Sequence, residues 1–202
     1  MKKTISIGIQ VFSDLREQDC FFVDKTNFIK EWWENRDVVT LITRPRRFGK
    51  TLNMSMLECF FSKKYANRAD LFEGLSIWQD ETYRKLQGAY PVIFLSFAAV
   101  KAGNLEDAKT QIKQEIARLY WENRNLMKED IFGEDERELY YRTTVKMDDV
   151  TAQDSLRNLS VWMERYYGKK VIILLDEYDT PMQEAYVQGY WDEFTTFVRS
   201  LF

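Results

Sequence analysis

One stretch decides the predicted fold: residues 38–57 read VVTLITRPRRFGKTLNMSML. The first six residues, 38–43, are mostly β-branched and apolar, which is typical of a buried strand. From Leu52 onward apolar side chains recur at every third or fourth position, which indicates a helix. The tripeptide Gly49-Lys50-Thr51 therefore stands where a predicted strand gives way to a predicted helix.

Helical and strand-like segments alternate along the rest of the chain, which predicts an α/β fold. Helical spacing covers residues 25–35, 105–119 and 156–166, and a last helix carries Trp191, Phe194, Phe197 and Val198 along one side. Short apolar runs at residues 92–97 and 171–175 predict two further strands. Gly168 is expected to end the helix before the last strand. We find no internal repeat and no Pro/Gly-rich linker, so we expect one domain over residues 1–202.

Composition excludes several classes of protein. The 202 residues contain no histidine, so neither His general-base catalysis nor a His-ligated metal is available to this chain. Its 2 cysteines are too few for a zinc site or a disulfide framework, which favours a reduced, cytoplasmic setting. A net charge of -3 argues against binding nucleic acid by bulk charge. The apolar runs are too short to span a bilayer, so we expect a soluble protein with no membrane partner.

The Gly49-Lys50-Thr51 tripeptide partly matches the phosphate-binding pattern G-x-x-x-x-G-K-[ST]. In that pattern backbone N–H groups and the helix N-terminus face a triphosphate, the Lys contacts the phosphates and the hydroxyl ligates Mg²⁺. The first glycine of the pattern is replaced here by Arg44. The tripeptide alone is more typical of an ordinary helix start with a solvated lysine.

The predicted strand at residues 171–175 supplies a second signal, because Asp176 and Glu177 follow it directly. The carboxyl ends of strands are where open α/β sheets bind ligands. A carboxylate in the position of Asp176 can hold Mg²⁺, and its neighbour Glu177 can polarise a water without help from histidine. The alternative is that Asp176 and Glu177 are merely solvated acids in a loop. Together with Gly49-Lys50-Thr51, the acidic strand end favours a nucleoside triphosphatase.

Three motifs resemble the AAA-ATPase-like family of uncharacterised bacterial P-loop proteins. They are residues 43–57, with Arg in place of the generic glycine, residues 22–26 (FVDKT) and residues 175–181 (LDEYDTP). The resemblance covers nearly the whole chain. It implies a three-layer α/β/α P-loop core with a mainly parallel sheet, binding ATP and Mg²⁺. It implies Lys50 and Glu177 for catalysis and Thr51 and Asp176 for the metal. The implied nucleotide-binding residues are Arg44, Arg46, Arg47, Phe48, Gly49, Lys50, Thr51 and Leu52.

Family members usually continue into a nuclease-like domain of the PD-(D/E)-x-K type. We expect that domain to be absent here. We also expect the ATPase core to be incomplete, because the strand that bears a polar sensor residue in P-loop ATPases with such a catalytic Glu has no counterpart after Asp176. The favoured function is a Mg-dependent ATPase with the P-loop (Walker A) and acidic (Walker B) motifs. The alternatives are a nucleotide-dependent switch that hydrolyses little while serving a nuclease-like domain, and a structural domain with a vestigial P-loop. A homo-oligomer, and nucleic-acid binding through the absent domain, stay open.

Three features have competing interpretations. The basic cluster of Arg44, Arg46, Arg47 and Lys50 can bind a γ-phosphate or a nucleic-acid backbone, or be merely solvated. Trp32-Trp33 is expected to pack against the sheet rather than to stack on adenine. Cys59, at an apolar helical position, is expected in the core.

Overall fold

The computed structural model describes residues 4–5, 7–43, 45 and 47–201. Internal contacts divide the chain into two compact units, residues 1–92 and residues 93–202, which we call the N-terminal and C-terminal units. This division rests on contacts within each unit and does not test the single domain expected over residues 1–202, which stays a prediction.

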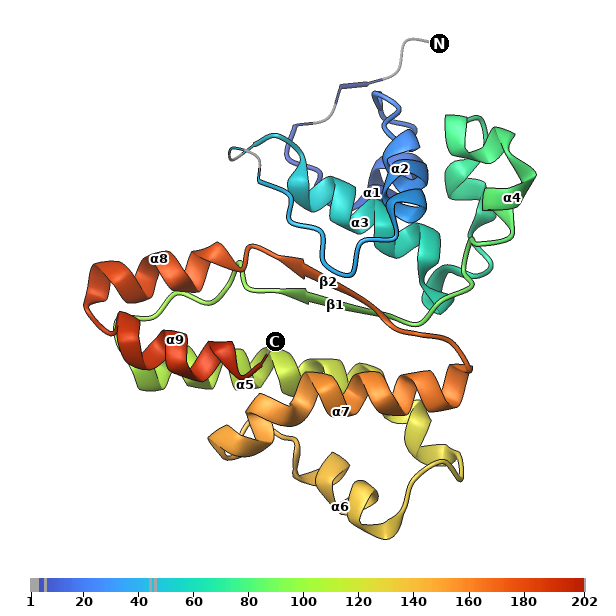
Figure 1. The fold of residues 1–202 in the computed structure, drawn as a ribbon. Helices are drawn as coiled ribbons and strands as arrows, with labels where there is room; N and C mark the ends of the chain where they lie inside the picture. Colours follow the sequence, from blue (N-terminus) through green and yellow to red (C-terminus); the bar gives the residue numbers. More distant parts are fainter. Residues whose placement is uncertain (1–3, 6, 44, 46, 202) are drawn as a thin grey trace. The chain divides into compact units, whose positions relative to one another are not determined.

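The N-terminal unit is helical in its described residues (Figure 1). Its α-helices are α1 (Phe12–Glu17), α2 (Asn27–Asn35), α3 (Lys50–Phe61) and α4 (Glu81–Arg84). Between α3 and α4 the chain forms three short 3-10 helices, η1 (Lys63–Tyr65), η2 (Ala69–Phe72) and η3 (Ser76–Gln79). The predicted helices at residues 25–35 and from Leu52 are therefore confirmed as α2 and α3.

Aromatic packing around α3 forms the core of this unit. The Phe72 ring stacks on Phe12 with centroids 5.2 Å apart and meets Phe60 edge-on at 5.0 Å. Trp33 of α2 stacks on Phe61 of α3 at 5.3 Å. The tryptophan pair is thus a packing element, as expected, but it covers a helix rather than a sheet. Aromatic pairs of this geometry add to the stabilisation from buried area alone.

The strand predicted over residues 38–43 is wrong. The backbone there is irregular, and Val38, Val39 and Leu41 are 101%, 83% and 64% exposed. Within the described part of the N-terminal unit, the β-type pairing is a lone parallel bridge between Ser62 and Tyr90. A strand is stable when neighbours pair its backbone and cover its side chains, and β-propensity largely measures that packing. A β-branched run without a partner strand therefore stays irregular.

The C-terminal unit combines a small sheet with helices. In chain order its elements are β1 (Val92–Ser96, all but its first residue in this unit), α5 (Leu105–Glu122), η4 (Arg124–Lys128), α6 (Glu134–Arg142), α7 (Asp149–Tyr167), β2 (Ile172–Asp176), α8 (Asp179–Gln188) and α9 (Trp191–Arg199). Both predicted strands and the three predicted helices of this region are confirmed. The sequence predicts one helix after Asp176, whereas the described residues there form two, α8 and α9. Gly189, the residue after α8, separates them.

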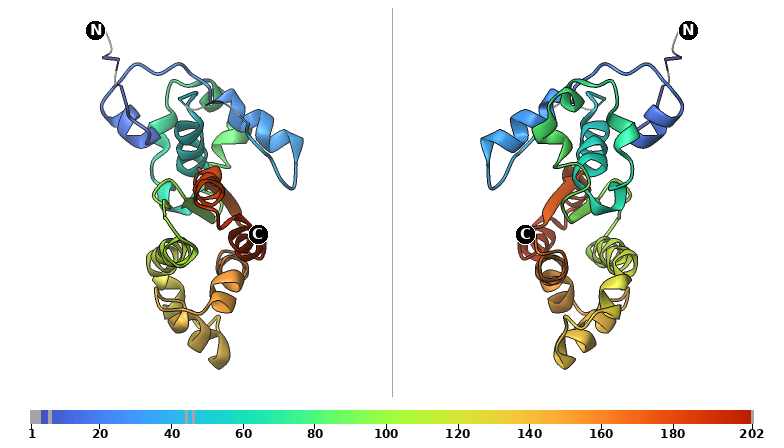
Figure 2. Two further views of the ribbon diagram at one scale, coloured as in Figure 1. Left: turned by 90° about the vertical axis from the view of Figure 1, so that its left-hand side faces the viewer. Right: turned by 90° about the vertical axis from the view of Figure 1, so that its right-hand side faces the viewer.

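The two strands lie side by side and run parallel (Figure 1). The Phe97 amide donates a hydrogen bond of 3.0 Å to the Asp176 carbonyl, which joins the carboxyl ends of the strands. Ile93 and Leu95 of β1 and Leu175 of β2 pack into the helical core. Helices α5 and α7 lie on one side of the strands, as the side views also show (Figure 2). Since side chains alternate along a strand, Asp176 points to the face opposite Leu175.

An α/β fold with a parallel sheet is therefore confirmed, whereas the three-layer P-loop core stays a prediction.

Local sequence signals mark the ends of α5 and α7. The Asn104 side chain accepts a 2.9 Å hydrogen bond from the Asp107 amide at the start of α5, and Asp148 accepts one of 2.7 Å from Thr151 at the start of α7. Helix α7 ends at Gly168 with a φ of 65°, the left-handed conformation expected of it.

Candidate functional site

The predicted phosphate-binding residues surround the start of α3. Gly49 is the N-cap residue with φ 73° and ψ 24°, a left-handed conformation that glycine adopts without steric cost. Its carbonyl accepts a 3.0 Å hydrogen bond from the Asn53 amide, which closes the first helical turn. Among the described residues no side chain caps this N-terminus. Backbone donors of the first turn are therefore available to an anion.

The residues before Gly49 are exposed where the structure describes them. Arg47 is exposed and has a φ of 68°, which is uncommon for a residue with a Cβ atom. Phe48 is 59% exposed. Arg44 and Arg46 lie outside the described residues. Non-glycine residues in this conformation cluster at functional sites, because surrounding structure must hold them there.

Helix α3 follows the loop at residues 47–49 and is anchored in the core by its later residues. Lys50, Thr51 and Leu52 are half-buried in its first turn, whereas most residues in the second half of the helix are buried in the core. The hydroxyl of Ser55 also accepts a buried hydrogen bond of 3.0 Å from the Phe12 amide. Neither Arg47 nor Lys50 forms an ion pair within the described part of the chain. Among the described residues, two cations thus flank a helix N-terminus without carboxylate partners, which favours binding of an anion.

The acidic strand end is formed by residues of β2 and the turn into α8. Asp176 is the last residue of β2 and is 3% exposed. Glu177 follows with a φ of 54° and is half-buried. The Thr180 hydroxyl donates a 3.1 Å hydrogen bond to the Glu177 carboxylate, and the Thr180 amide donates one of 3.0 Å to the Glu177 carbonyl. Glu177 is therefore held in one orientation.

Thr180 is a residue that the sequence reasoning missed. It is buried, at 7% exposure, and its contact with Glu177 depends on the left-handed turn between β2 and α8. The available signal was its position three residues after Glu177 at a predicted strand end, since Thr favours local hydrogen bonds at such turns.

Cys59 is a core residue, as expected. Its side chain is 0% exposed, and burial raises the pKa of its thiol to about 11. The thiol is therefore protonated at neutral pH and unsuited to act as a nucleophile.

The predicted site residues fall into two groups. Lys50, Thr51 and their neighbours belong to the N-terminal unit, and Asp176 and Glu177 belong to the C-terminal unit. The roles predicted for the residues of each group stay predictions. The joining of the two groups into one site stays a prediction.

Each of the two groups contains one oxygen donor of a kind that suits magnesium. The described residues contain no cluster of three or more His, Cys, Asp or Glu side chains that could hold a metal by themselves. Mg²⁺ in phosphate-transfer sites needs no such cluster, because phosphate oxygens and waters fill most of its coordination positions. The Thr51 hydroxyl and the Asp176 carboxylate are hard oxygen donors of the kind that this ion prefers. Their chemistry fits the ion.

Comparison with known proteins identifies the family of this chain. A family model described as "Predicted AAA-ATPase" matches residues 6–202, almost the whole chain. The chain belongs to the AAA-ATPase-like family. It is also 29% identical over 182 residues to an uncharacterized protein in the vnfD 5′ region of Azotobacter chroococcum mcd 1. That alignment covers 90% of this chain and 30% of the relative, so the chain spans about a third of the relative's length. No solved structure matches.

Membership of the AAA-ATPase-like family supports nucleotide use in general terms. No described helix has the length and apolarity needed to cross a membrane.

Proposed function

We propose that this AAA-ATPase-like chain binds ATP with Mg²⁺ and hydrolyses it. The start of α3 is the observation that carries the proposal. A left-handed Gly49 opens the helix, the first turn has no side-chain cap among the described residues, and Lys50 stands in that turn without an ion-pair partner there. This arrangement provides backbone donors and a cation for a polyphosphate.

Each residue has a separate role in the proposal. Lys50 binds the β- and γ-phosphates, and the backbone amides of Lys50, Thr51 and Leu52 cradle them. Arg47 and Phe48, together with Arg44 and Arg46 outside the described residues, complete the nucleotide-binding loop. Thr51 and Asp176 would hold Mg²⁺, which would neutralise charge on the phosphate oxygens.

Hydrolysis follows as an in-line displacement at the γ-phosphorus. A water oxygen forms a bond to phosphorus while the bond from phosphorus to the β,γ-bridging oxygen breaks, and ADP leaves. The Glu177 carboxylate orients the water and takes its proton. Thr180 positions this carboxylate through its hydroxyl, at 3.1 Å. The electron pair of the broken bond remains on ADP, and Lys50 stabilises the charge that develops on the phosphates.

Calorimetry of ATP binding with Mg²⁺ tests the proposal directly. We expect Lys50→Ala to weaken binding tenfold or more, because a charge-assisted contact to phosphate is lost. Lys63→Ala is the matched control, since Lys63 is an exposed lysine beyond the opposite end of α3. Equal affinity of the Lys50→Ala and unaltered chains would contradict the phosphate-binding role. Release of inorganic phosphate, measured on the same samples, separates an ATPase from a switch that binds ATP and hydrolyses little.

A further inference from the structure

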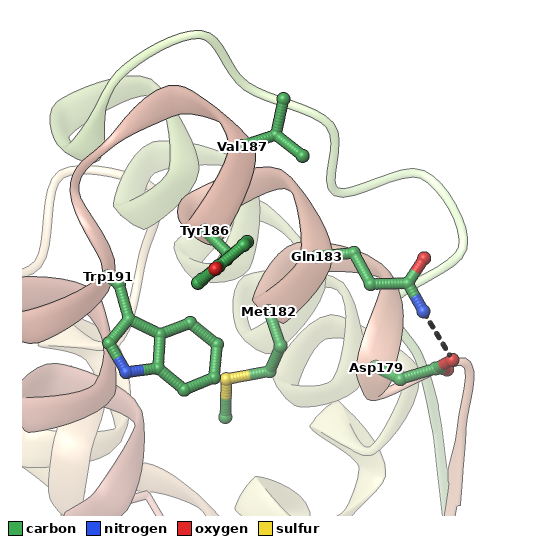
Figure 3. Close-up of a pocket in the computed structure, with 6 residues that line it drawn as sticks. All are labelled: Asp179, Met182, Gln183, Tyr186, Val187 and Trp191. Carbon is green, nitrogen blue, oxygen red and sulfur yellow. Dashed lines mark hydrogen bonds between the residues drawn. The ribbon is translucent and has the colours of Figure 1, made fainter.

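The C-terminal unit carries a second candidate site, which involves none of the predicted nucleotide-binding residues. It is a pocket of about 650 Å³ on α8 and the start of α9. Figure 3 shows the six side chains that line it. They are Asp179, Met182, Gln183, Tyr186, Val187 and Trp191, which we call the α8–α9 pocket.

The lining combines aromatic surfaces with one fixed carboxylate. The rings of Tyr186 and Trp191 meet edge-to-face, with centroids 6.1 Å apart, and they remain 75% and 42% exposed. Met182 lies beside the indole ring (Figure 3). Asp179 accepts a 3.0 Å hydrogen bond from the Gln183 amide, which fixes its carboxylate at the edge of the pocket. Aromatic faces next to a carboxylate are suited to a cation that is also flat or partly apolar.

The two helices that form the pocket carry more acidic than basic residues. No Lys or Arg occurs anywhere from residue 171 to residue 198, whereas α8 and α9 carry Asp179, Glu184, Asp192 and Glu193. None of these four carboxylates forms an ion pair with another described residue. By contrast, Asp149 on α7 of the same unit lies 2.8 Å from the Lys109 ammonium. The α8–α9 surface therefore presents uncompensated negative charge around an aromatic hollow.

The chain itself contains an example of the contact that this pocket lacks. The Arg124 guanidinium lies over the Trp121 ring, 4.0 Å from its centroid. No described cation occupies the corresponding position over Trp191 or Tyr186. Arginine prefers such faces because its guanidinium is planar and weakly hydrated.

We propose that the α8–α9 pocket binds an arginine side chain on a basic segment of a partner protein. The guanidinium stacks on Trp191 and Tyr186 and pairs with Asp179, while Glu184, Asp192 and Glu193 attract the basic residues beside it. A protein segment fits better than a small cation because the acidic side chains extend along two helices. A nucleic acid fits worst, since phosphates are repelled by the same charges. The proposal is independent of ATP hydrolysis.

Titration of the full chain with a triarginine peptide, followed by NMR, tests this proposal. The indole N–H resonance of Trp191, identified by its loss in Trp191→Phe, is expected to move to saturation. A peptide with citrulline in place of arginine, which keeps the shape and removes the charge, is expected to leave it in place. Trp191→Ala should lower the affinity about two- to fivefold, the range for an exposed cation–π contact. Tyr141→Ala is the control, since Tyr141 is an exposed ring on α6 (69%) away from this charge.

Three results would overturn the proposal. Equal binding of the citrulline peptide would show that charge is not recognised. Shifts spread over acidic surfaces, with Trp191 unaffected, would show only non-specific attraction. Movement of the Trp191 resonance on dilution of the protein alone would show that a second copy of the chain covers the pocket.

Discussion

Replacement of Asp24 by Asn offers a quantitative test of how the N-terminal unit is held together. The Asp24 carboxylate links the start of α2 to η3 through four hydrogen bonds. Its Oδ1 accepts from the Thr26 amide at 2.9 Å and from the Thr26 hydroxyl at 2.7 Å. Its Oδ2 accepts from the Ser76 amide at 2.7 Å and from the Ser76 hydroxyl at 2.6 Å. An Asn side chain has one acceptor oxygen and loses half of these contacts.

The size of the effect follows from the pKa of this carboxyl group. Desolvation by itself would raise the pKa of Asp24, but the hydrogen bonds from Ser76 and Thr26 outweigh it and lower the pKa from 3.8 to about 2. That difference corresponds to at most about 2.4 kcal/mol, at 1.36 kcal/mol per pKa unit. Because Asp24 is exposed, solvent screening reduces the expected contribution to about 1 kcal/mol.

The sign of the pH dependence is fixed by the direction of the shift. A carboxyl with a lowered folded-state pKa stabilises the fold above its unfolded-state pKa, here 3.8, and that stability disappears as pH falls through about 2. The difference in unfolding free energy between the unaltered chain and Asp24→Asn should therefore be about 1 kcal/mol at pH 7. It should shrink as the pH drops from 4 toward 2.

Urea unfolding followed through the amide resonances of Ser76 and Ile77 measures this difference within the N-terminal unit. Ile77 is a useful second probe because its amide donates to the Thr26 hydroxyl at 3.1 Å. Asp37→Asn, an exposed carboxyl of the same unit, serves as the control and should change little at any pH. A destabilisation by Asp24→Asn that stays constant from pH 7 to pH 2 would refute the reasoning, because the charge of the carboxylate would then be irrelevant.

Three predictions concern the acidic strand end. Asp176→Asn should weaken ATP binding more with Mg²⁺ than with a chelator present; equal losses in calorimetry would leave the carboxylate only a structural role. Glu177→Gln should retain bound ATP and lower phosphate release about 10²- to 10⁴-fold, whereas a loss within threefold would exclude it as the base. Thr180→Val should lower kcat about tenfold without raising KM, and Thr180→Ser should restore it; a change confined to KM would remove its positioning role.

Sequence patterns predicted those elements that are stabilised by local contacts or by pairing with a neighbouring strand. Helix α7 has a side-chain cap at Asp148 and a glycine stop at Gly168, and both work within one turn of chain. Strand β2 is a mostly apolar segment, and so is β1, the strand that pairs with it. The run at residues 38–43 looked the same by composition, yet in the structure it lacks a partner strand among the described residues of its unit. Composition cannot reveal whether a neighbour will be present.

The site was predictable to a similar extent. Gly49, Lys50 and Thr51 were predicted to stand at the start of a helix, and the structure shows that start, although the strand expected before it is absent. The Thr180 contact was not found, since it requires Glu177 to adopt a φ of 54°. A left-handed conformation at a residue other than glycine costs about 1 kcal/mol or more, so no propensity argument favours it in advance.

That strained turn gives two neighbouring carboxylates different environments. In a continuing strand Glu177 would alternate away from Asp176 and enter the helix-covered face, where a charge is costly to bury. The positive φ at Glu177 instead ends the strand after Asp176 and starts the turn into α8. Asp176 is left almost fully buried, at 3% exposure, whereas Glu177 is half-buried and oriented by Thr180. Two acids in sequence with separate surroundings can serve separate functions. A buried carboxylate suits a fixed metal ligand, and an oriented, more accessible one suits contact with water, which is the division of roles proposed for Asp176 and Glu177.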